Sequence, residues 1–128
     1  MTDMPMAREV LDWQLELSWS QSEHDFLTCY REDSFLITPT AVHRGLEAIR
    51  ACYGQLRRDL PNARFTYKVV IVEQDVGFVE WSADSDTHQV VDGADSYIIQ
   101  NGYIRAQTIH STLIPKNGPR DIARAQRA

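Results

Sequence analysis

Cysteine is scarce in this sequence, and no long apolar run occurs in it. Cys29 and Cys52 are its two cysteines among 128 residues, without a CxxC pair or a histidine at metal-ligand spacing. We therefore expect two reduced core thiols rather than a disulfide framework or a metal site. No segment approaches the ~20 apolar residues of a membrane span, and residues 1–8 lack the apolar core of a signal peptide. These absences predict a cytoplasmic protein with no membrane partner.

Positive charge is also in short supply. The 13 Lys and Arg residues stand against 18 Asp and Glu, which gives a net charge of −5. A phosphate-binding face needs clustered cations, and here the basic residues cluster in the C-terminal tail. We therefore expect no nucleic-acid partner. The sequence also lacks GxGxxG, Walker, HExxH and GxSxG motifs, so the default prediction is a function without a cofactor or metal.

The length and composition are those of one soluble domain. A hydrophobic content of 43% with 24% charged residues is ordinary for a globular chain that can bury a core. No internal repeat or linker divides the sequence. We assign residues 1–114 to a single domain and residues 115–128 to a polar C-terminal tail.

Three segments show helical spacing of apolar residues. The first follows Pro5 and carries a stripe of four side chains, Met6, Val10, Trp13 and Leu17. A capping-box pattern at residues 22–25 predicts a short second helix. The third helix is expected between Gly45 and Pro61, with five apolar side chains at spacings of three and four, Leu46, Ile49, Tyr53, Leu56 and Leu60.

Beyond Pro61 the apolar period changes to two, which is typical of strands. We expect four strands, at residues 64–73, 77–84, 87–100 and 103–114, and one shorter strand at 34–38. Asn101-Gly102 suits a type I′ turn, which places the last two strands side by side and antiparallel. Helices followed by a run of strands predict an α+β domain with helices on one face of an antiparallel sheet.

The last predicted hairpin contains polar side chains that a buried hairpin should avoid. Asp95 lies in its first arm, and Gln107 and His110 lie in its second. Buried polar groups are costly unless they have partners. Asp95 is either a buried acid in a pocket or a carboxylate satisfied by nearby amides or water. Arg105 shares the parity of Gln107, so an ion pair with Asp95 is a competing possibility. His110 has the opposite parity unless a bulge intervenes, so its direction stays open.

The element order and the segments CYREDSFLITP, RGLEAIRACY and GADSYIIQNGYIRAQ resemble the NTF2-like superfamily. Within it, the chain is most similar to the SnoaL-like and ketosteroid-isomerase-related branch, over residues 6–114. The resemblance implies a cone in which a curved antiparallel sheet holds three helices on its concave face. The superfamily includes isomerases, cyclases, dehydratases and non-enzymatic pockets, so it fixes the fold more than the chemistry.

The resemblance also implies a role for Asp95. In ketosteroid isomerases, an Asp on the penultimate strand stays protonated and donates a hydrogen bond to a developing oxyanion. Asp95 matches that position. The general base of those enzymes is an Asp directly before the proline that ends the first strand, and here that residue is Thr38. Because a threonine cannot take a proton from a carbon acid at neutral pH, ketosteroid isomerisation by the family's usual route is not expected.

These observations predict a cofactor-free pocket for a small apolar molecule, with isomerase, cyclase or dehydratase-like acid–base catalysis. Asp95 would supply the acid and His110 the base. The pocket wall is expected to contain six further side chains, Trp13, Tyr30, Tyr53, Trp81, Tyr97 and Gln107. The alternative is a non-catalytic ligand-binding or dimerisation domain.

The strands carry apolar residues on both faces, and helices can cover one face alone. Val70, Phe78 and Ile98 are expected opposite the concave set that contains Trp81. We therefore predict a homodimer that forms through the convex side of the sheet.

Overall fold

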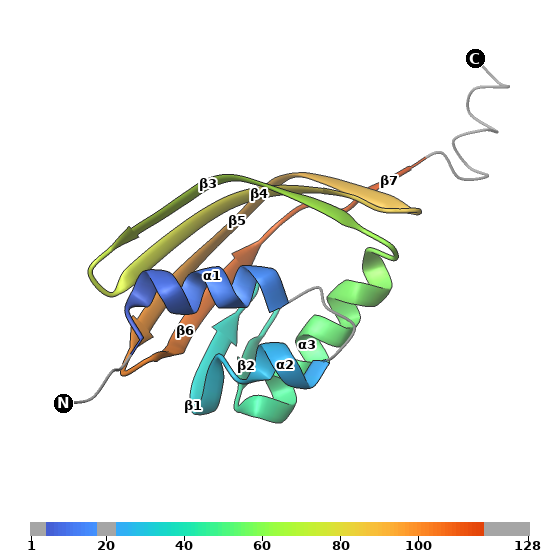
Figure 1. Cartoon of the computed structure of the whole chain (residues 1–128). Coiled ribbons are helices and arrows are strands. Elements are labelled where there is room, and N and C mark those ends of the chain that lie inside the picture. The colour runs from blue at the N-terminus through green and yellow to red at the C-terminus, as the bar shows by residue number, and fades with distance from the viewer. Residues whose placement is uncertain (1–4, 18–22, 117–128) are drawn as a thin grey trace, which may run out of the picture.

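The computed structural model describes residues 5–17 and 23–116. In this part of the chain, three helices lie on the concave side of a strongly curved sheet (Figure 1). The helices are α1 (Ala7–Leu17), α2 (Glu23–Leu27) and α3 (Leu46–Asp59). The strands are β1 (Tyr30–Ile37), β2 (Val42–Arg44), β3 (Arg64–Glu73), β4 (Val76–Asp84), β5 (His88–Gln100), β6 (Tyr103–His110) and β7 (Ile114–Pro115). Within the described ranges, no helix is long and apolar enough to cross a membrane.

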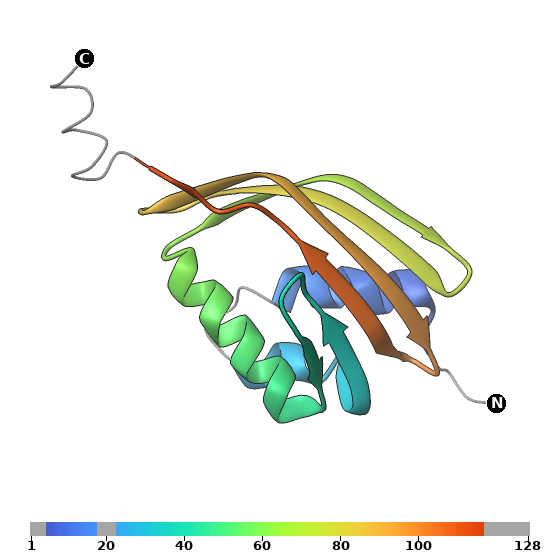
Figure 2. The same ribbon diagram turned by 180° about the vertical axis from the view of Figure 1, so that it is seen from behind.

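The strand order is β2-β1-β6-β5-β4-β3, and β7 pairs with β5 (Figure 2). The α+β cone with helices on its concave face is confirmed. The expectation of a wholly antiparallel sheet was wrong at one pair, because β1 and β6 run parallel. Tyr30 at the start of β1 pairs with Ile104 at the start of β6. β1, which follows α2, and β6, which follows the Asn101-Gly102 turn, therefore begin at the same end of the sheet.

The strand boundaries follow the apolar alternation closely from β3 onward. β3 has the predicted bounds, and β4 and β5 differ from prediction by one residue each. The last predicted strand divides into β6 and the short β7, which reaches Pro115. The backbone amide of Lys116 also donates to Thr87 O at 2.8 Å. Pairing with the sheet thus extends slightly into the segment assigned to the tail, and residues 117–128 lie outside the described part.

A bulge in β3 changes which of its side chains reach the core. Lys68 is the extra residue, since Tyr67 and Val69 both keep partners on β4 while the register shifts between them. An extra residue reverses the alternation beyond it. Val70 is consequently packed against the core, and the prediction that it lies on the convex face was wrong.

The face of α1 that packs on the sheet also differs from the predicted stripe. Val10, Leu11 and Gln14 are buried, whereas Met6 is 71% exposed and Trp13 is 47% exposed. The helix therefore turns an amide, Gln14, toward the interior in place of the indole of Trp13. Hydropathy alone favours burial of the Trp13 indole. Gln14 is buried in its place because distant segments of the chain supply hydrogen-bond partners for its amide.

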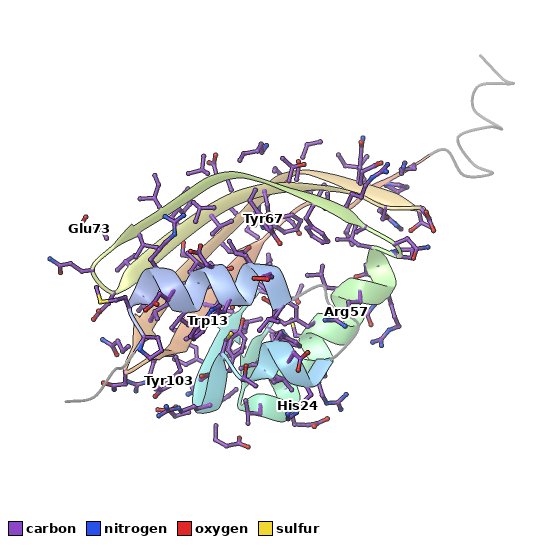
Figure 3. All side chains as sticks on the ribbon, in the orientation of Figure 1. Trp13, His24, Arg57, Tyr67, Glu73 and Tyr103 are labelled. Atoms are coloured by element: carbon purple, nitrogen blue, oxygen red, sulfur yellow. The ribbon has the colours of Figure 1, made fainter. Side chains whose placement is uncertain are left out.

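Side chains fill the space between the sheet and the helices (Figure 3). Tyr67 points from β3 into this space, and its hydroxyl donates to the Leu15 carbonyl at 3.2 Å. α3 contributes Ile49 and Tyr53 to the core, as its apolar spacing predicted. The cone is therefore largely packed rather than hollow.

Four exposed apolar side chains form two cross-strand pairs on the convex face of the sheet. Ile71 pairs with Phe78, and Val76 pairs with Ile98. We call this set the convex patch, Ile71, Val76, Phe78 and Ile98. The convex patch therefore spans three neighbouring strands, β3, β4 and β5, on the face that the described helices do not cover.

Candidate functional site

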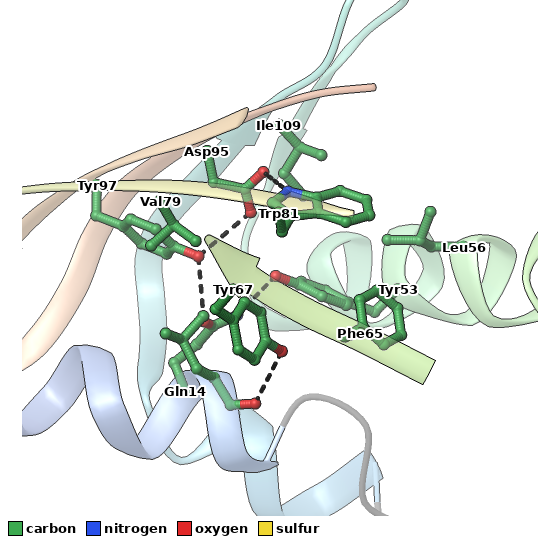
Figure 4. Close-up of a pocket in the computed structure, with 11 residues that line it drawn as sticks. Gln14, Tyr53, Leu56, Phe65, Tyr67, Val79, Trp81, Asp95, Tyr97 and Ile109 are labelled. Carbon is green, nitrogen blue, oxygen red and sulfur yellow. Dashed lines mark hydrogen bonds between the residues drawn. The ribbon is translucent and has the colours of Figure 1, made fainter. Parts of the chain in front are cut away.

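Asp95 is buried at the centre of the concave face, with 7% of its surface exposed. Three neutral side chains, Trp81, Tyr97 and Gln107, donate hydrogen bonds to its carboxylate. Figure 4 shows the bonds from Trp81 and Tyr97. Trp81 Nε1 donates to Oδ1 at 2.9 Å, and Gln107 Nε2 donates to Oδ2 at 3.1 Å. Tyr97 Oη lies 3.2 Å from Oδ2. The acid is thus satisfied by side chains from β4, β5 and β6 rather than by backbone amides of the hairpin.

Gly93 allows Trp81 to reach Asp95. The two residues Trp81 and Gly93 are cross-strand partners on β4 and β5. A Cβ atom built on Gly93 would lie 2.3 Å from indole atoms Cδ2 and Cε2, closer than real contacts permit. Glycine therefore lets the indole lie flat across the neighbouring strand with its N–H directed at the carboxylate.

A second set of hydrogen bonds joins two glutamines and three tyrosines beneath Asp95. Gln14 Nε2 donates to Tyr53 Oη at 2.8 Å and to Tyr30 Oη at 3.3 Å. Gln107 Nε2 donates to Tyr53 Oη at 3.0 Å, and its Oε1 accepts from Tyr30 Oη at 2.5 Å. Tyr97 Oη lies 3.2 Å from Gln14 Oε1. Such a network fixes each side chain in one orientation because every member satisfies another.

The Tyr97 hydroxyl links the two sets and can serve both protonation states of Asp95. Its oxygen is 3.2 Å from Asp95 Oδ2 and from Gln14 Oε1, but one hydroxyl has one hydrogen to donate. When Asp95 is protonated at Oδ2, it donates to Tyr97, and Tyr97 donates to Gln14. When Asp95 is ionised, the Tyr97 hydrogen turns to the carboxylate and the bond to Gln14 is lost. The neutral acid therefore keeps both contacts.

Burial raises the pKa of Asp95 to about 6, although the hydrogen bonds from Trp81, Gln107 and Tyr97 lower it. Desolvation disfavours the charged form, and it outweighs the three donors here. Arg105 does not form the competing ion pair. It is the extra residue of a bulge in β6, between Ile104 and Ala106, and its Nε lies 3.6 Å from Asp33 Oδ2. The bulge turns Arg105 outward despite the parity that it shares with Gln107.

Burial likewise raises the pKa of the three tyrosines Tyr30, Tyr53 and Tyr97 above the usual range. A negative charge on Asp95 raises the pKa of Tyr53 and Tyr97 further. These hydroxyls therefore stay protonated near neutral pH, where they can donate hydrogen bonds.

A small cavity, which we call the inner chamber, lies against Asp95. Its volume is about 20 Å³, and its polar lining comes from six side chains, Gln14, Tyr53, Tyr67, Trp81, Asp95 and Tyr97. A space of this size holds about one water-sized group. Phe65 and Trp81, whose ring centroids are 5.5 Å apart, fill the space beside it. Within the described residues, the space directly beside Asp95 is therefore sized for one water-sized group and not for a whole ligand.

The structure brings together six of the eight predicted site residues, Tyr30, Tyr53, Trp81, Asp95, Tyr97 and Gln107. The predicted position of Trp13 was wrong, and the direction of His110, which the sequence left open, is outward. Trp13 is on the outer side of α1, and His110 is exposed on the convex face because it alternates with the buried Ile109. Gln14 is a member of the network that the sequence interpretation missed. Its spacing of three and four residues from Leu11 and Val10 is the signal that could have found it.

A curved, unclosed sheet with three described helices on its concave side forms an NTF2-like cone. An NTF2-like protein from Cytophaga hutchinsonii superposes on the chain with a TM-score of 0.68 at 10% identity, covering 96% of this chain and 99% of that one. The sequence pattern of the SnoaL-like domain matches residues 15–107. The chain therefore belongs to the SnoaL-like family.

Solved structures with low sequence identity share this fold. A proposed isomerase of the SnoaL-like family from Agrobacterium tumefaciens is 15% identical, with a TM-score of 0.66 over 83% of this chain and 97% of that chain. A proposed polyketide cyclase from Sinorhizobium meliloti is 14% identical, with a TM-score of 0.68 over 84% and 95%. At such identities the likeness establishes the fold alone. Among curated proteins, none matches the sequence.

Proposed function

We propose that this protein binds a small, apolar, oxygen-bearing molecule and polarises its oxygen with Asp95, in isomerase or cyclase-like chemistry that needs no cofactor. The observation that carries the proposal is the buried Asp95, whose pKa is raised to about 6 beside a cavity lined by tyrosine hydroxyls. A group with a pKa near the working pH can both hold and release a proton.

The protonated form of Asp95 is the useful one for such a substrate. A ligand oxygen in the inner chamber would accept a hydrogen bond from the acid, and the Tyr53 and Tyr97 hydroxyls line the same space. Donors fixed in a desolvated site stabilise negative charge that develops on an oxygen during enolisation. Because the donors are held by a network, they need no reorganisation as the charge forms.

The fold neighbours are consistent with this class of chemistry. They include a proposed isomerase and a proposed polyketide cyclase. The base that His110 was expected to supply has to come from elsewhere, since that imidazole is exposed on the opposite face. Asp95 polarises the bound oxygen while solvent water or hydroxide takes the proton from the neighbouring carbon, so the proposal does not depend on His110.

A non-catalytic ligand-binding domain is the second candidate. The observation that favours it is the size of the inner chamber, which at about 20 Å³ cannot enclose a whole substrate. The two candidates differ in one measurable property. An enzyme of the proposed kind accelerates proton exchange at the carbon beside a bound carbonyl, and a passive pocket does not.

Exchange of α-hydrogens for deuterium in a panel of cyclic ketones, followed by NMR in heavy water, tests the proposal. We expect acceleration by the wild-type protein and a loss of roughly 100-fold or more in Asp95→Asn, the usual contribution of a positioned acid. Asp92→Asn is the matched control, because Asp92 is an exposed acid on the same strand. Equal exchange rates in wild type and Asp95→Asn would leave the passive pocket as the better description.

A further inference from the structure

A second, larger space lies beside the inner chamber. This groove has a volume of about 540 Å³ and runs between α3, the turn after β1 and the end of β6. We call it the outer groove and define it by six of its lining residues, Thr38, His43, Cys52, Leu56, Ile109 and Leu113. Its volume falls in the range of small-molecule sites, whereas that of the inner chamber does not.

Two side chains separate the outer groove from the inner chamber. Leu56 on α3 and Ile109 on β6 line both spaces. Ile109 is also the direct cross-strand partner of Asp95. Figure 4 shows Leu56 and Ile109 approaching the Trp81 indole from α3 and from the sheet. A ligand lying in the groove would therefore be one side-chain layer away from the carboxyl group.

Asp95 also influences the groove electrostatically. Burial raises the pKa of the Cys52 thiol, and the charge of Asp95 raises it further. Cys52 lines the outer groove. This influence agrees with the position of Ile109, the cross-strand partner of Asp95, on the wall of the same groove.

The groove lining favours an uncharged, mostly apolar ligand. Apolar side chains from α3 and the end of β6 form much of its wall, and Asp59 is an acid at its edge. Among the described residues that line it, there is no lysine or arginine to attract an anion. Hydrogen-bonding groups lie near the β1–β2 turn, where Thr38 Oγ1 is 3.5 Å from His43 Nε2.

We propose that the apolar body of the ligand occupies the outer groove while a single oxygen passes between Leu56 and Ile109 into the inner chamber. This inference rests on the proposed function of Asp95 and adds the place and class of the ligand. The inner chamber admits one oxygen-sized group, and the groove holds the rest. The ligand is therefore an uncharged ketone or alcohol whose oxygen stands at the edge of an apolar skeleton without bulky neighbouring substituents.

Protection of Cys52 from alkylation tests occupancy of the groove. β-Tetralone and its parent hydrocarbon tetralin are the probes, and peptide mass spectrometry reads Cys52 separately from the buried Cys29. Both probes are expected to slow alkylation of Cys52. The ketone should do so at about three- to tenfold lower concentration, which is the worth of one hydrogen bond. If neither probe protects Cys52, the ligand does not lie in this groove and the inference is overturned.

Two half-buried leucines provide a matched pair of variants for the passage. Leu56 lines both spaces, and Leu113 lines the groove alone. The α,α-dimethyl derivative of β-tetralone has a crowded oxygen, so wild type should bind it no better than tetralin. Leu56→Ala should restore about threefold or greater preference for this crowded ketone, by admitting its oxygen to the acid. Leu113→Ala should weaken all three compounds alike. The same response in both variants would show that Leu56 does not guard the chamber.

The pH dependence separates failure of this inference from failure of the proposed function. The preference for β-tetralone over tetralin, measured by equilibrium dialysis, should disappear between about pH 5 and pH 8 as Asp95 ionises. If the probes protect Cys52 but the preference for β-tetralone over tetralin does not change with pH, the groove is the binding site and Asp95 is not the donor. That result overturns the inference as stated. Loss of α-hydrogen exchange in Asp95→Asn without Cys52 protection would keep the acid and reject the groove.

Discussion

Replacing Gly93 by alanine tests whether the Trp81–Asp95 hydrogen bond depends on a missing side chain. The added Cβ would lie 2.3 Å from two indole carbons and 2.7 Å from Nε1 of Trp81. Real Cβ contacts are longer than 3.0 Å, so the indole has to move by a substantial part of an ångström. Its N–H now donates to Asp95 Oδ1 at 2.9 Å, and that bond would be lengthened or broken.

The expected cost has two parts. Overpacking of a filled core costs about 1–3 kcal/mol, and the loss of a hydrogen bond to an ionised carboxylate costs about 1.5–3 kcal/mol. Allowing for some relaxation, Gly93→Ala should lower the free energy of unfolding by about 3–5 kcal/mol at neutral pH. The pKa of Asp95 should also rise above about 6, because the Trp81 donor is one of the contacts that lower it.

Urea unfolding measures the stability, and ¹³C NMR of the carboxyl group measures the pKa. Gly77→Ala is the control, because a Cβ there meets the end of Leu11 at 3.1 Å and should cost about 1 kcal/mol or less. In a Trp81→Val background, Gly93→Ala should cost under about 1 kcal/mol, since the clash is gone. A stability within about 0.5 kcal/mol of wild type for Gly93→Ala, with an unchanged Asp95 pKa, would refute the reasoning.

Three further predictions follow from the network and the convex patch. The folded-state pKa of Asp95 is raised to about 6, so folded Asp95 binds a proton more tightly than the unfolded chain does. Wild-type stability should therefore fall by about 3 kcal/mol between about pH 4 and pH 7 relative to Asp95→Asn; parallel pH profiles of the two proteins in urea titrations would contradict this. Gln107→Leu removes three hydrogen bonds and should lower the free energy of unfolding by about 2–4 kcal/mol. Replacement of the exposed His110 by alanine should change the free energy of unfolding by less than about 0.5 kcal/mol and the rate of ketone exchange by less than about twofold. We also propose that the protein forms a homodimer through the convex patch. Light scattering at micromolar concentration should then report a dimer for wild type and a monomer for Phe78→Lys. A monomeric wild type would contradict the proposal.

The alternation of apolar residues predicted most of the sheet, because burial on one face imposes a period of two. The inward set that contains Val79, Trp81 and Ala83 is buried as expected. The Asn101-Gly102 turn placed Asp95 in the correct arm of the hairpin, and the resemblance to the ketosteroid-isomerase-related branch implied that it points into the cone. Local pattern was sufficient wherever the strands are regular.

The failures occur where a single residue or a distant partner decides the outcome. One extra residue at Lys68 and one at Arg105 reverse the faces that follow them, and no local feature of the sequence marks those positions as bulges. Gln14 is buried because tyrosines from β1, α3 and β5 satisfy its amide. That stabilisation depends on the assembled fold, so the helical period alone favoured Trp13.

The parallel pairing of β1 with β6 has a consequence for synthesis of the chain. Ser34 in β1 donates a hydrogen bond to the carbonyl of Ile104, 70 residues later. On the ribosome, β1 and the helices α1, α2 and α3 emerge before β6, the strand that pairs with β1. Pairs so distant in sequence close slowly, and exposed strand edges in the meantime invite aggregation. Pairing of β1 in the sheet therefore has to wait until β6 is translated, and nearly the N-terminal half of the chain, up to Asp59 at the end of α3, is made before then.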